Sequence, residues 1–150
     1  MYELHEEIRK WNTVSNTYKY GVRKYLTALG KALYKEMFQV ELPELPFEYE
    51  FDVDYPATLG QFIYITNSYT GDYVRAECIR LSPVTIGRVK LHTHVLKHEL
   101  IHAYLAFNGH ANEGHGLRFQ RLAKKHKVVT MYNGEIQIAR TNVRELLEEE

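Results

Sequence analysis

The sequence predicts an α+β fold in which N-terminal helices are followed by a small three-stranded antiparallel sheet, and the sheet by further helices. Apolar residues recur at helical spacing in the first third of the chain, alternate with a period of two in the middle, and return to helical spacing after residue 90. A length of 150 residues suits one domain, residues 1–150, which buries about two thirds of the surface that the unfolded chain exposes.

Two helices are predicted in the N-terminal third, over residues 3–15 and 20–39. Their apolar residues lie three or four apart, as on one face of a helix: Leu4, Ile8, Trp11 and Val14, then Val22, Tyr25, Leu26, Leu29, Leu33 and Met37. The prolines of "ELPELP" (41–46) end this region, because the residue before a proline is pushed towards extended geometry.

Three strands are predicted next. In "FEYEFDVDY" (47–55) aromatic and apolar residues alternate with four acids, which indicates a strand with one buried face. "LGQFIYITN" (59–67) and "DYVRAECIRLS" (72–82) are two further strands, joined by a turn that contains Gly71.

The last third combines helices with a hairpin. A helix from about Leu91 to Phe107 ends at Asn108–Gly109, because glycine accepts the left-handed conformation, and a second helix covers 117–127. Asn133–Gly134 predicts the two-residue turn of a C-terminal β-hairpin. Residues 142–150 read as a short closing helix with capping-box spacing at its start.

Composition restricts the classes of function. Lys plus Arg equals Asp plus Glu at 19 each, so the overall charge predicts neither a nucleic-acid nor a membrane partner. Cys78 is the one cysteine, which excludes an internal disulfide and a thiolate zinc ribbon. The chain has neither a signal-peptide-like start nor an apolar run of transmembrane length, and we expect a cytoplasmic protein.

Four of the eight histidines lie between Leu96 and Gly116. His98 and His102 are four residues apart, so both lie on one face of the helix and can reach one ion at about 2.0–2.1 Å. Glu99 projects roughly 100° around the helix axis and can address a metal-bound water without being a ligand. This "HExxH" pattern is typical of a catalytic zinc site with the glutamate as general base.

A catalytic zinc site needs a third protein ligand and an open fourth position. His94 is excluded, because it lies about 12 Å from His102 along the helix axis, and we interpret it as a helix-surface residue. His110, Glu113 and His115 remain in the loop that follows. Spacing favours His115, since the start of the next helix would hold it, but it leaves the other two open.

The segment "HELIHAYLAFNGHANEGHGLRFQRLAKK" (98–125) closely resembles the active-site segment of the SprT-like/Spartan zinc metalloproteases. In that family an HExxH helix is followed by a loop and a "GHG…F" element that supplies the third histidine. "TLGQFIYITNSYTGDYVRAECIRLS" (58–82) is similar to the family's strand pair. The resemblance covers roughly residues 58–125. It implies a zincin-like minimal metalloprotease core with Zn²⁺ bound by His98, His102 and His115, and with Glu99 as the catalytic residue.

Many members of that family carry a cysteine-based zinc module after the protease core, implicated in DNA contact. Cys78 lies before the HExxH helix and cannot build such a module, so the resemblance extends to the protease core and leaves the DNA role open.

Charge is distributed unevenly along the chain. Residues 41–60 hold six acidic residues and no basic one. The four acids of 47–55 read either as a solvated strand face or as a surface for cationic substrates such as basic DNA-binding proteins. Residues 118–127 hold five basic residues and no acidic one: Arg118, Arg121, Lys124, Lys125 and Lys127. These read either as the solvated face of a helix whose Leu117, Phe119 and Leu122 point inward, or as a surface that contacts DNA phosphates.

The expected function is a zinc metalloendopeptidase in which Glu99 takes a proton from zinc-bound water as that water attacks a peptide bond. The substrate would be a protein or peptide extended along a sheet edge. DNA-associated or DNA-crosslinked proteins, as in DNA–protein crosslink repair, are one candidate class. The alternatives are a zinc peptidase with a dedicated protein substrate and no DNA role, and a non-catalytic zinc-bound binding module. Glu99 argues against the last, because a purely structural site needs no base.

Overall fold

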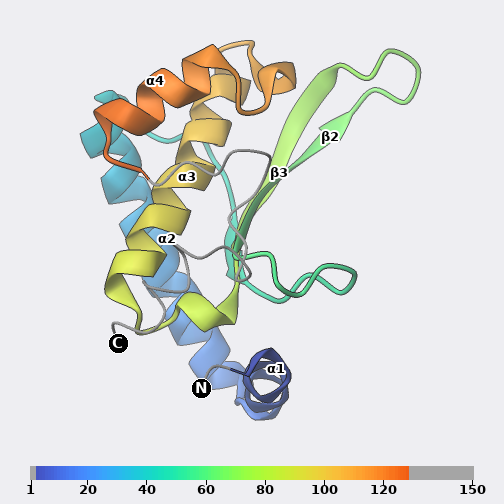
Figure 1. Cartoon of the computed structure of the whole chain (residues 1–150), viewed down its shortest axis with the longest axis vertical. Helices are drawn as coiled ribbons and strands as arrows, with labels where there is room; N and C mark the ends of the chain where they lie inside the picture. The colour runs from blue at the N-terminus through green and yellow to red at the C-terminus, as the bar shows by residue number, and fades with distance from the viewer. Residues whose placement is uncertain (1–2, 129–150) are drawn as a thin grey trace.

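The computed structural model describes residues 3–128 and confirms the α+β class (Figure 1). The predicted hairpin at Asn133–Gly134 and the closing helix lie outside these residues, and the assignment of residues 1–150 to one domain stays a prediction. Within the described chain, no helix is both long and apolar enough to span a membrane. The elements are, in order, α1 (Leu4–Thr13), α2 (Asn16–Phe38), β1 (Phe47–Tyr49), β2 (Gly60–Thr66), β3 (Tyr73–Leu81), the 3₁₀ turn η1 (Pro83–Thr85), α3 (Val89–Phe107), the 3₁₀ turn η2 (Ala111–Glu113) and α4 (Leu117–Lys125).

The helices form where apolar spacing and capping residues agree. Helix α2 begins four residues earlier than predicted, because the Ser15 hydroxyl accepts a hydrogen bond from the Tyr18 amide at 3.1 Å and so caps the helix. It ends where Gln39 turns left-handed, with φ 60°. Helix α1 buries Trp11, whose indole Nε1 donates to Glu50 at 3.0 Å and so ties α1 to the segment after β1.

The sheet is mixed, so the prediction of an antiparallel sheet is wrong for one of its two pairings. The strand order is β1-β3-β2, with β2 antiparallel and β1 parallel to the central strand β3. Consecutive strands most often pair with each other, but β1 and β2 lie on opposite sides of β3. The connecting segment crosses the end of β3, so β1 arrives in the same direction as β3.

Strand β1 is also shorter than its alternating pattern predicts. Phe47, Tyr49 and Phe51 are buried, but Val53 is 94% exposed and Tyr55 71%. The Asp52 carboxylate accepts hydrogen bonds from the amides of Asp54 (2.9 Å) and Tyr55 (2.8 Å). This local turn competes with strand pairing, and it ends the strand although the alternation continues.

Helix α3 forms the centre of the molecule. It lies between α2 and the β2–β3 hairpin, with α4 crossing its C-terminal half (Figure 1). Eleven of its 19 residues are buried, among them Leu96, Leu100 and Ile101 with no exposed surface, as expected for a helix covered on several sides. The predicted stop is confirmed: the helix ends at Phe107, and Gly109 takes a positive φ of 84°.

Gly60, the first residue of β2, lets the sheet approach α3 closely. A Cβ atom at this position would lie 2.5 Å from Cγ1 of Val95, 3.1 Å from Cγ of Glu99 and 3.3 Å from Cδ2 of Leu81. The absence of a side chain therefore sets the distance between β2 and the part of α3 that carries the histidines.

Gly60→Ala should lower the free energy of unfolding by about 1–3 kcal/mol, because the added methyl group overpacks a buried contact. Gly21→Ala is the matched control: no atom lies within 4 Å of its Cβ position, it lies in helix α2, and alanine should raise stability by about 0.5–1 kcal/mol. Urea unfolding of both variants measures the difference. Equal effects would contradict the close packing at Gly60.

The buried pair Tyr49–His92 predicts a pH dependence of stability. Its Oη and Nε2 atoms lie 2.5 Å apart, and burial lowers the pKa of His92 to about 4, so the neutral ring accepts the Tyr49 hydroxyl proton. In the unfolded state the pKa of this histidine is about 6.5, so between pH 4 and pH 6.5 the unfolded chain binds more protons than the folded one. Stability should therefore be full above pH 6.5 and fall by on the order of 3 kcal/mol as the pH drops to 4.

Urea unfolding of His92→Gln across this pH range should give a shallower slope than the unsubstituted chain. His5→Gln, at a side chain that is 78% exposed, should leave the slope unchanged. Parallel slopes for His92→Gln and the parent would refute the assignment.

Candidate metal centre

Helix α3 supplies two of the predicted histidines. His98 and His102 are one turn apart, and their Nε2 atoms lie 3.3 Å from each other. His98 is fully buried, whereas His102 keeps partial exposure, so the pair lies where the interior of the molecule meets its surface.

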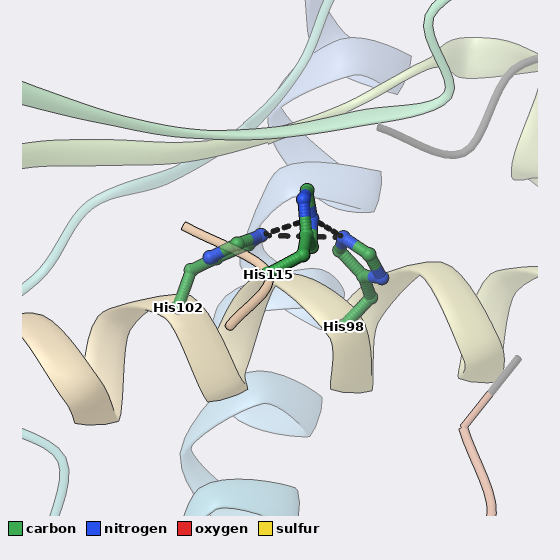
Figure 2. A group of neighbouring side chains, drawn as sticks. All are labelled: His98, His102 and His115. Atoms are coloured by element: carbon green, nitrogen blue, oxygen red, sulfur yellow. Dashed lines mark hydrogen bonds between the residues drawn. The ribbon is translucent and has the colours of Figure 1, made fainter. Parts of the chain in front are cut away.

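The chain returns to α3 through η2, and this return brings the third histidine next to the other two. The Nε2 atom of His115 lies 3.1 Å from that of His98 and 3.0 Å from that of His102. Figure 2 shows the three rings turning their nitrogen atoms towards a common point. The return is held at its backbone: the Gly116 amide donates to the Glu113 carbonyl at 3.0 Å, and Gln120 Nε2 donates to the His115 carbonyl at 3.1 Å.

The spacing of these nitrogen atoms fits a metal ion. Four ligands at 2.0–2.1 Å around a tetrahedral centre have ligand–ligand distances of about 3.3–3.4 Å, and the observed 3.0–3.3 Å lies close to this. Lone pairs on convergent ring nitrogens repel each other unless a proton or a cation lies between them. His98, His102 and His115 therefore form a group that could hold a metal ion.

Phe119 packs against all three rings. Its centroid lies 4.8 Å from that of His98, 4.6 Å from that of His102 and 4.8 Å from that of His115, and Phe119 is 1% exposed. Sequence reasoning placed this residue inside but missed that it touches the histidines. The available signal was its spacing, since Phe119 follows His115 by four residues at the start of a helix. It restricts the rotation of the rings and excludes water from one side of the group.

Glu99 lies beside the histidines on the side of β2. It is 1% exposed, and its Oε1 atom lies 3.9 Å from Nε2 of His98. Its methylene carbon fits against Gly60, whose missing side chain makes the room. The importance of Gly60 to the site was also missed, because a contact between distant segments leaves no local pattern.

The other ligand candidates do not join the group. His110 Nδ1 pairs with Glu113 Oε2 at 2.6 Å, and Glu113 Oε1 also meets Arg118 at 3.5 Å. These contacts brace the loop instead of approaching the three histidines. His94 is half-buried, and burial together with Lys97 lowers the pKa of its ring.

The basic residues predicted in the last helix lie on and just after α4. All five are exposed, and Arg118 pairs with Glu113 in the preceding loop. Phe119 is buried and Leu122 half-buried, but Leu117 is 65% exposed, so the prediction that it points inward is wrong. Leu117 is the first residue of the helix and lies beyond the contact with α3.

Three of the four acids of 47–55 have partners within the described chain. Glu48 accepts from Arg80 at 2.7 Å, Glu50 from Trp11, and Asp52 from Gln61 at 2.8 Å. They connect β1 and the segment after it to neighbouring elements, and their use for a cationic substrate stays a prediction. Burial raises the pKa of the Cys78 thiol to about 11, which keeps the thiol protonated and unsuited to act as a nucleophile.

Comparison with known proteins gives one result. No curated protein and no solved structure matches this chain. A family model described as the SprT-like family matches residues 1–142, well over half of the chain. The chain therefore belongs to the SprT-like family.

Proposed function

We propose that this protein is a zinc-dependent endopeptidase. The observation that carries the proposal is the convergence of three histidine Nε2 atoms, 3.0–3.3 Å apart, with a buried glutamate in the same helical turn. Membership of the SprT-like family supports a metalloprotease-type activity. The proposed ligands are His98, His102 and His115, and the proposed catalytic residue is Glu99.

Zinc suits this donor set better than the harder cations. Three imidazole nitrogens without a carboxylate match the tetrahedral ligand menu of Zn²⁺, whereas Mg²⁺ and Ca²⁺ prefer oxygen ligands. Three protein ligands leave a fourth position for solvent or substrate. When bound, zinc would lower the pKa of a coordinated water to about 7 and polarise the carbonyl group of the substrate.

Glu99 is the residue proposed to move the proton. We infer that its carboxylate accepts a proton from the attacking water and passes it to the nitrogen of the leaving amine. Burial against β2 keeps bulk water from the carboxylate and strengthens its electrostatic interactions. Its position on the helix, next to His98 but turned towards β2, keeps it close to the centre without making it a ligand.

Strand β2 offers the substrate a binding edge. Within residues 3–128, β2 pairs with β3 on one side only. A peptide in extended conformation could add to the other side through backbone hydrogen bonds, as in other cases of strand addition. Because Gly60 touches Glu99, a peptide on this edge would pass the proposed centre.

The burial of Glu99 argues against the non-catalytic alternative. A carboxylate that is 1% exposed costs folding free energy, and a purely structural zinc site gains nothing from it. A zinc peptidase with a dedicated substrate and no DNA role stays an alternative, and so does the DNA-directed form.

Glu99→Gln should keep zinc at the content of the unsubstituted protein and lower kcat/KM for peptide hydrolysis by about 10²–10⁴-fold, because the general base is lost. Zinc analysis and peptide cleavage on the same preparation measure both effects. Glu36→Gln, on the exposed surface of α2, is the matched control and should behave as the parent. Loss of zinc in Glu99→Gln would instead make Glu99 a structural residue.

His115→Ala should weaken zinc binding by at least about 100-fold, since removal of a ligand costs more than loss of an outer-shell contact. Titration with a competing chelator measures the affinity. His110→Ala tests the rival residue and should retain zinc. The reverse pattern would assign the third ligand to His110.

Contact with DNA through the exposed basic residues of α4 stays a prediction with its own test. Lys124→Gln combined with Lys125→Gln should weaken binding to a duplex oligonucleotide. The slope of log K against log salt concentration should become shallower by about two, because two phosphate contacts are lost. Arg9→Gln on α1 is the control. An absence of binding even at low salt would remove DNA from the function and leave the peptidase proposal unaffected.

A further inference from the structure

The β2–β3 hairpin carries a row of aromatic rings on the face turned towards α3. Phe62 stacks on Tyr64 with 5.5 Å between ring centroids, Tyr64 meets Tyr73 at 5.8 Å, and Phe62 meets Phe107 of α3 edge-on at 6.5 Å. Gly60 begins β2 in contact with α3, and residues two apart on a strand share a face. We call Phe62, Tyr64, Tyr73 and Phe107 the aromatic row.

The aromatic row begins at the core and ends in solvent. Ile79, the partner of Phe62 across the sheet, is fully buried, Phe62 and Phe107 are half-buried, and Tyr64 is 36% exposed. The tip of the hairpin projects away from the helices, and Tyr69 there is 96% exposed (Figure 1). Contiguous apolar surface of this kind is typical of a binding site, whereas a single exposed ring is not.

The aromatic row starts next to the proposed catalytic residue. Gly60 lies against Glu99, and Phe62 is two residues further along the same strand, about 7 Å away at the usual rise of a strand. Phe107 follows His102 by five residues on α3. A peptide extended along β2 has a similar rise, so residues within about three positions of the cleaved bond would reach the row.

We propose that the aromatic row binds a substrate side chain and selects peptides with an aromatic or large aliphatic residue within a few positions of the cleaved bond. The proposal rests on the peptidase function above and adds a substrate preference to it. Backbone pairing with β2 supplies affinity, and alternate side chains of the peptide turn towards α3, where they meet the row. Aromatic rings 4.5–7 Å apart attract each other beyond the area they bury, which favours aromatic residues.

A packing role is the rival explanation. In that case the rings only hold the hairpin against α3, and truncation of Tyr64 would loosen the hairpin for every substrate alike. The two explanations differ in one measurable quantity, the ratio of kcat/KM between a peptide with an aromatic residue and the same peptide with alanine.

The experiment first maps cleavage sites of the zinc-loaded full chain in a peptide library by mass spectrometry. We expect aromatic and large aliphatic residues to be enriched at one position close to the cleaved bond. Two peptides that differ there, Phe against Ala, are then compared, and the Phe/Ala ratio of kcat/KM should be about 10 or more. In Tyr64→Ala the ratio should fall towards 1, and in Tyr64→Phe it should be retained.

Tyr69→Ala, at the tip of the hairpin and outside the aromatic row, is the matched control and should keep the parent's ratio. A flat cleavage profile, or an unchanged ratio in Tyr64→Ala, would overturn the proposal. If the protein cleaves nothing, the peptidase proposal fails, and the inference is decided separately by the binding of two fluorescently labelled peptides that differ only by Phe against Ala at one position. A preference for the Phe peptide that Tyr64→Ala abolishes supports the row as a binding surface, and equal binding of both peptides refutes it.

Discussion

Helix α3 must be covered on several sides at once, and the candidate metal centre depends on this packing. Its apolar residues fix it against α2 and the sheet, while α4 crosses it and brings Phe119 onto the rings of His98 and His102. Only in this packing does the returning loop place His115 within 3.1 Å of both. The separation of α3 from the sheet is in turn set by Gly60, where a methyl group would already collide with Val95.

The polar groups of the centre are buried in a mainly apolar setting. His98 has no exposed surface and Glu99 almost none, and both follow Val95 and Leu96 in a helix that is otherwise part of the core. Burial of such groups costs free energy unless partners compensate for it. A cation among the three ring nitrogens would provide this compensation, so metal binding and the stability of the α3–α4 packing should be coupled.

The order of the sheet explains how one strand can serve several purposes. Because β3 is central, β2 is an edge strand of the described sheet, and its first residue touches Glu99. The same strand continues through Phe62 and Tyr64 into the projecting hairpin. The closeness to Glu99, the edge proposed for backbone pairing and the surface proposed for side chains therefore follow from a single strand and its direction.

Local chemistry determined what the sequence by itself could predict. The C-terminal end of α3, the turn at Gly71, the strands β2 and β3 and the pairing of His98 with His102 on one face depend on residues close together in the chain. The tertiary structure decided the parallel direction of β1, the early end of that strand at Asp52, the exposure of Leu117 and the contacts of Gly60 and Phe119. It also decided which residue of the loop reaches the helix, because spacing left His110, Glu113 and His115 open. Contacts between distant segments depend on the packing of whole helices and strands, and no periodicity within one segment encodes them.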